Sequence, residues 1–155
     1  MKITGLLLLL TLVLSNLSAQ SAKEEVDFMQ SVFGMGKKSL VAEFVKPGAA
    51  QKDAFWRLYD EYEMARKELG KKRIELLLKY EENFDNLSNE LAAVLLKEIQ
   101  ALTKKNDKLV ASYVKKVSKA TDPVVAMQFH QIEMYVMSEI RVALAEGLPF
   151  PEVKK

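Results

Sequence analysis

The sequence predicts an all-α protein, an elongated antiparallel hairpin or bundle of about four helices that assembles as a dimer. Apolar residues recur at spacings of three and four through almost the whole chain after residue 22, which is the period of an amphipathic helix. No segment alternates apolar and polar residues over a useful length, so we expect no β-sheet. Only four prolines and six glycines interrupt the 155 residues, and they separate the periodic segments.

The first residues are typical of a secretory signal peptide. Lys2 gives a positive start, residues 5–14 are almost purely apolar, and small and polar residues follow. The apolar run is about ten residues long, whereas a membrane-spanning helix needs about 20. We therefore expect residues 1–19 to be cleaved off after Ala19, with a cut after Ala22 as the alternative. The remaining residues 20–155 are expected to form a single helical domain in a bacterial periplasm.

Composition excludes several classes of protein. The chain has no cysteine, which excludes a disulfide framework, thiolate chemistry and a lipid anchor on cysteine. Removing residues 1–19 takes away one of the 23 basic side chains, Lys2, and none of the 21 acidic ones, so the processed chain has a net charge of +1. This balance does not indicate a nucleic-acid partner.

The first two periodic segments are divided by Pro47-Gly48. The first segment, residues 23–45, places its apolar side chains on one face but has two glycines in its middle, each weakening a helix by about 1 kcal/mol relative to alanine. We expect a kink or a short break there. The second segment, residues 49–84, carries one apolar stripe, in which Arg73 stands where an aliphatic residue would be expected.

The last two segments have clear start signals. Ser88 is an N-cap candidate for residues 89–119, whose apolar seam has the seven-residue spacing of a coiled coil and is interrupted by Asn106. A helix of that length is about 46 Å long, which favours an elongated molecule. Asp122 is the N-cap candidate for residues 123–146, where a proline takes the first helical position and glycine follows the end.

The last predicted helix has two apolar stripes. The first is Val125, Phe129, Ile132, Val136, Ile140 and Ala143, and the second is Met127, His130, Met134, Met137, Arg141 and Leu144. A helix that is apolar on two faces must bury both or use one to bind something. Since methionine is flexible and polarisable, the second stripe is our candidate surface for an unfolded client, a protein partner or a second subunit. The alternative is that this helix lies at the centre of the bundle.

An aromatic cluster opens the second segment. It consists of Phe55, Trp56, Tyr59 and Tyr62, which together cover more than one helix face. One interpretation is a core anchor beneath the first segment. The other is a partly exposed ledge on a concave surface, and on that interpretation we include these four residues among the candidate client-binding or partner-binding residues.

The sequence does not indicate an enzyme. His130 is the only histidine, with Glu133 one helical turn away, and a zinc or di-iron site needs more ligands than these two. There is no pattern typical of a nucleophile elbow, and no glycine-rich phosphate loop. We therefore expect no catalytic residue, no metal and no cofactor.

Positive charge gathers near the end of the third segment. Between Lys104 and Lys119 there are six lysines, and the only acidic residue is Asp107. Such a run could bind an acidic partner or phospholipid headgroups at the membrane periphery. The alternative is an ordinary solvated helix face.

Four short stretches of the chain share a recognisable pattern: Phe55–Tyr62, Tyr80–Phe84 with Leu87-Ser88, Gln131–Glu133 and Gly147–Phe150. In these stretches the chain resembles the small exported helical proteins of Bacteroidota related to the Spy/CpxP family of periplasmic chaperones. The four stretches extend over most of the processed chain. The Leu-Thr-x-x-Gln motif of the best-known members is absent, and its nearest counterparts are Leu87–Leu91 and Pro47–Gln51.

The resemblance implies a long-helix fold that pairs into a curved homodimer and holds unfolded clients on its concave face without ATP. We therefore expect an ATP-independent periplasmic chaperone or envelope stress-response protein. Some relatives are described as sensors linked to extracytoplasmic sigma factors, so the alternative is a signalling protein that binds one specific partner.

Overall fold

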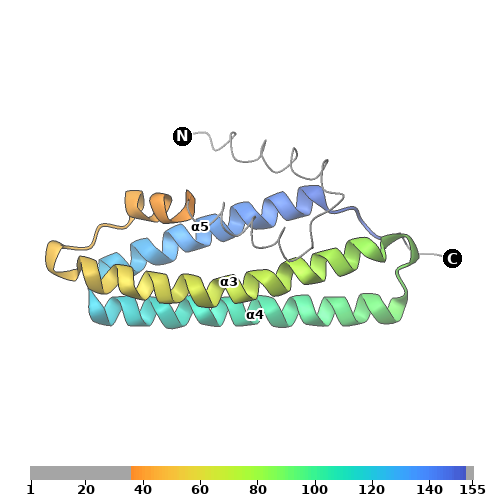
Figure 1. Ribbon diagram of the computed structural model, residues 1–155, viewed down its shortest axis with the longest axis horizontal. Helices are drawn as coiled ribbons and strands as arrows, with labels where there is room; N and C mark the ends of the chain where they lie inside the picture. The colour runs from red at the N-terminus through yellow and green to blue at the C-terminus, as the bar shows by residue number, and fades with distance from the viewer. Residues whose placement is uncertain (1–35, 153–155) are drawn as a thin grey trace.

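The computed structural model describes residues 36–152, and every regular element in that range is helical (Figure 1). This confirms the all-α prediction. The three long helices are α3 (Lys52–Glu82), α4 (Asn89–Ala120) and α5 (Pro123–Gly147). A helical segment at residues 36–44 precedes them, and two short 3-10 turns, η1 (Ala49–Gln51) and η2 (Phe84–Asn86), flank α3. The predicted signal peptide and most of the first predicted segment lie outside the described residues.

The long helices lie side by side in an elongated arrangement (Figure 1). α4 runs back along α3, and α5 then runs along α4 from the end where the two are joined. Segment 36–44 lies against the first half of α5, where the backbone N–H of Lys46 donates to Gln128. This order follows from short connections, since a few residues between long helices leave only antiparallel neighbours.

The predicted caps set the ends of the helices. The Ser88 hydroxyl accepts a hydrogen bond from the backbone N–H of Leu91 at 3.2 Å. The Asp122 carboxylate accepts from the N–H groups of Val124 and Val125, both at 2.9 Å, with proline at the start of α5. These side chains satisfy N–H groups that have no partner within the helix. The predicted segment 49–84 is interrupted near both ends by the 3-10 turns.

The apolar core fills one end of the molecule. Its residues come from segment 36–44 and the following loop, the first third of α3, the last part of α4 and the first half of α5: Val41, Val45, Phe55, Leu58, Tyr59, Tyr62, Val110, Tyr113, Val117, Val125, Ala126, Phe129 and Ile132. Beyond Glu63, α3 has no buried residue. The bundle therefore has a closely packed end and an open end, where apolar side chains are covered on one side only.

Two polar residues of the apolar seams lie toward the open end. Asn106 is buried in α4, and Arg73 of α3 is half-buried. Burial lowers the pKa of Arg73, and the neighbouring Arg141 lowers it further. Arg141 itself lies 3.8 Å from Asp107 of α4, so this group of charges marks where the end of α5 passes α3 and α4.

Candidate binding surface

Helix α5 buries one face and exposes a face without charge. Its buried residues are Val125, Ala126, Phe129, Ile132, Glu133 and Met137. From Val124 to Ser138 the only formally charged residue is Glu133, and its side chain is fully buried. The exposed residues include Val124, Met127, Met134, Tyr135 and Val142, with exposed fractions between 42% and 67%. We call these five side chains the outer face of α5.

The structure divides the predicted methionine stripe. Met127, His130, Met134 and Arg141 are exposed, whereas Met137 is buried and Leu144 is half-buried. The stripe is divided because it follows a line along the helix that crosses from the solvent side to the core side. Sequence reasoning missed the other exposed apolar residues, which are Val124, Tyr135 and Val142. Apolar residues on both faces of α5 gave no signal of which face is covered.

The aromatic cluster forms the centre of the core. Phe55, Tyr59 and Tyr62 are almost fully buried, and Trp56 is half-buried. The ring of Tyr62 packs edge-on against Phe129 of α5 at 5.3 Å and against Tyr113 of α4 at 5.5 Å between centroids. This arrangement agrees with the core-anchor interpretation. In this structure only Trp56 of the four offers surface to a partner, so an exposed four-residue ledge is not what the fold presents.

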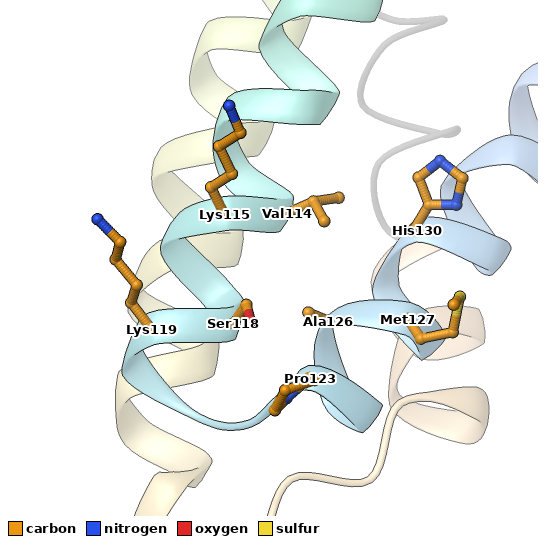
Figure 2. A pocket seen from close by; sticks show the side chains of 8 residues that line it. All are labelled: Val114, Lys115, Ser118, Lys119, Pro123, Ala126, Met127 and His130. Atoms are coloured by element: carbon orange, nitrogen blue, oxygen red, sulfur yellow. The ribbon is translucent and has the colours of Figure 1, made fainter.

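A shallow hollow lies where α4 ends and α5 begins (Figure 2). It has a volume of about 510 Å³, and its lining is mostly apolar. Val114 and Ser118 form part of the α4 wall, and Ala126, Met127 and His130 form part of the α5 wall. Met127 therefore belongs both to the hollow and to the outer face of α5, which makes the two surfaces continuous.

A buried charged cluster connects the first described segment to α3 and α5. The Lys37 ammonium group donates to Glu63 at 2.6 Å and to Glu133 at 2.8 Å. The Tyr62 hydroxyl donates to the same Glu133 oxygen at 2.6 Å. Arg66 donates to both oxygens of Glu63 at 2.9 and 3.0 Å. Two positive and two negative groups thus balance inside the protein, which is the condition for keeping charges there.

The surroundings of this cluster shift the pKa values of Glu63 and Tyr62. Burial would raise the pKa of the Glu63 carboxyl, but the nearby Lys37 and Arg66 outweigh that effect and lower it. Burial raises the pKa of Tyr62, and Glu133 adds to the rise, so the phenol stays protonated as a donor. The Tyr59 hydroxyl and the second oxygen of Glu133 are buried, and within residues 36–152 neither has a hydrogen-bond partner. Each such group costs about 1–3 kcal/mol, so the cluster is not fully satisfied.

The described residues show neither a metal cluster nor a membrane span. No group of three or more histidine, cysteine, aspartate or glutamate side chains within residues 36–152 is placed to hold a metal ion. In the same range, no helix combines the length and apolar character needed to cross a bilayer.

Comparisons with known proteins identify no relative of this chain. No protein-family model matches the chain, and comparisons with curated proteins and with solved structures find no match either. The resemblance to the Spy/CpxP family therefore stays a prediction, and the functional argument depends on the surfaces described above.

The buried cluster predicts unequal effects at two neighbouring lysines. Lys37→Met should lower the free energy of unfolding by about 3–5 kcal/mol, because it leaves the fully buried Glu133 without its positive partner. Lys38→Met is the control, since Lys38 pairs with Asp60 where both side chains are about half exposed, and such pairs contribute about 0–1 kcal/mol. Urea unfolding at neutral pH measures both. Equal losses in the two variants would contradict this account.

Proposed function

We propose that the protein is an ATP-independent periplasmic chaperone or envelope stress-response protein that binds unfolded polypeptides through the outer face of α5. The observation that carries the proposal is the uncharged exposed surface between Val124 and Ser138, next to the hollow at Met127. Isolated apolar residues on a protein surface are common, whereas several large apolar residues gathered on one side of a helix indicate a site of interaction.

The size of this surface suits weak and reversible binding. Burying a large apolar side chain completely gives about 1.5–3 kcal/mol, and the side chains of the outer face are already partly covered. Five such contacts give roughly 5 kcal/mol, while association costs at least about 4 kcal/mol in lost freedom of motion. Little net free energy remains, so a bound segment leaves quickly. A protein that only prevents aggregation needs this behaviour and needs no catalytic step.

The side chains of the outer face suit clients of varied sequence. Met127 and Met134 are two of its five side chains, and an unbranched thioether adapts its shape to different apolar partners. Since no exposed side chain from Val124 to Ser138 is charged, no particular charge pattern in the client is required there.

The second candidate is a signalling protein of the envelope that docks one specific partner. The feature in its favour is the hollow between α4 and α5, because a defined concavity selects a shape in a way that a flat apolar face does not. Cross-linking in the periplasm separates the candidates. One dominant adduct supports the sensor, and many adducts of different mass support the chaperone.

We also propose that the chain forms a homodimer through the open end of the bundle. There α4 exposes Leu96 and Ile99, which lie three residues apart on one side of the helix, and α3 has only half-buried leucines. A second copy with the same surface would cover both sets at once, since a two-fold axis pairs a patch with itself.

The chaperone proposal predicts that Met127 and Met134 contribute more to protection against client aggregation than Met64 does. Met127→Lys with Met134→Lys should remove most of the protection that the wild-type protein gives at equimolar ratio, because each lysine places a charge where the client must lose water. The readout is light scattering by reduced, denatured α-lactalbumin. Met64→Lys is the control, since Met64 is 65% exposed and belongs to α3, not to the outer face of α5. No protection by the wild type, or equal loss in both variants, would contradict the proposal.

The dimer proposal predicts that the molecular mass in solution depends on the exposed apolar residues at the open end of the bundle. Sedimentation equilibrium of the processed protein should give twice the chain mass. Leu96→Lys with Ile99→Lys should give the single-chain mass, because the two charges would be buried at the interface. A single-chain mass for the wild type at every concentration would refute the dimer while leaving the client-binding proposal open to its own test.

A further inference from the structure

Helix α4 carries a straight row of lysines. Between Lys97 and Lys119 there are seven lysines and two acidic residues, Glu98 and Asp107. Five of the lysines are separated by seven, four, seven and four residues, and we call them the lysine stripe: Lys97, Lys104, Lys108, Lys115 and Lys119. At 3.6 residues per turn these five fall within a sector of roughly 60° around the helix axis. All five are exposed.

The charges of the lysine stripe are not neutralised by neighbours. None of the five makes an ion pair in the part of the chain that the structure describes. Of the nearby acids, Asp107 lies beside Arg141. The exposed residues that share this side of the helix with the five lysines are small, namely Ala101, Ala111 and Ser112. Nothing bulky therefore stands above the lysine side chains along a line of about 33 Å.

The ammonium groups point away from the hollow. Figure 2 shows Lys115 and Lys119 projecting from α4 on the side opposite α5, so that only their stems border the hollow. An anion seated in the hollow would not meet these charges. Cations in a row along a straight helix can instead all contact a flat surface simultaneously. This geometry suits a planar array of anions.

We infer that the lysine stripe docks α4 lengthwise on an anionic lipid surface, with the lipid phosphates facing the five ammonium groups. The small net charge of the chain, +2, does not prevent this, because electrostatic interactions decay over about 8–10 Å at physiological salt. A helix with its side chains is about 10–12 Å across, so acids on the far side of the bundle contribute little. This inference is independent of the chaperone proposal, since it concerns α4 and not the outer face of α5.

The test is co-sedimentation of the processed protein with lipid vesicles of two compositions. One is phosphatidylcholine alone, and the other is equimolar phosphatidylcholine and phosphatidylglycerol. Each lysine near an anionic surface contributes about fivefold to binding, so Lys104→Gln, Lys108→Gln and Lys115→Gln together should weaken binding to the anionic vesicles on the order of a hundredfold. The control variant, Lys52→Gln, Lys72→Gln and Lys79→Gln on exposed positions of α3, has the same net charge.

The inference is supported if the wild-type protein binds only the anionic vesicles and salt weakens this binding. The α4 variant should then lose the binding, and the α3 variant should keep it. Equal loss in both variants, or equal binding to both kinds of vesicle, overturns it. Soluble polyglutamate serves as a further probe: if it binds the lysine stripe and the anionic vesicles do not, the partner is an acidic protein and the lipid inference fails. Circular dichroism of each variant confirms that the helices are intact.

Discussion

The contact of Lys37 with Glu63 and Glu133 holds the packed end of this protein together. It joins three segments that lie far apart in the sequence, at a point where the rings of Tyr62 and Phe129 already pack edge to face. Because the charges balance and lie inside, the position of segment 36–44 against α3 and α5 is fixed by geometry as well as by apolar contact. Among residues 36–152, the contacts of α5 lie on its inner face.

The functional proposals follow from that one-sided attachment. A helix held by one face must present the other to solvent, and polar residues normally fill that face. In α5 that face has no charged side chain from Val124 to Ser138, and most of its large exposed residues are apolar. In α4, by contrast, the outward face is strongly basic. The bundle thus turns two chemically different surfaces outward from adjacent helices, one suited to apolar segments and the other to anions.

Much of the fold could be predicted from local sequence, and much of the site could not. Ser88 and Asp122 act through hydrogen bonds to residues two or three positions away, so the starts of α4 and α5 were predictable. The burial of Tyr59 and Met137 depends on tertiary packing, which spacing alone does not reveal. The pairing of Lys37 with Glu133 spans 96 residues, and nothing near either residue indicates it. Periodicity locates stripes on a helix, but the identity of the covered stripe depends on its neighbours.

The central claim is that α5 has a free apolar face, and the rate of methionine oxidation tests it most directly. Exposed thioethers react with dilute peroxide, whereas buried ones are protected. Met127 and Met134 should be oxidised at rates close to that of Met64, and Met137 much more slowly, since their exposed fractions are 58%, 42%, 65% and 6%. Peptide mass spectrometry of the processed protein gives all four rates. Protection of Met127 and Met134 to the level of Met137 would mean that this face is covered, and the account would be wrong.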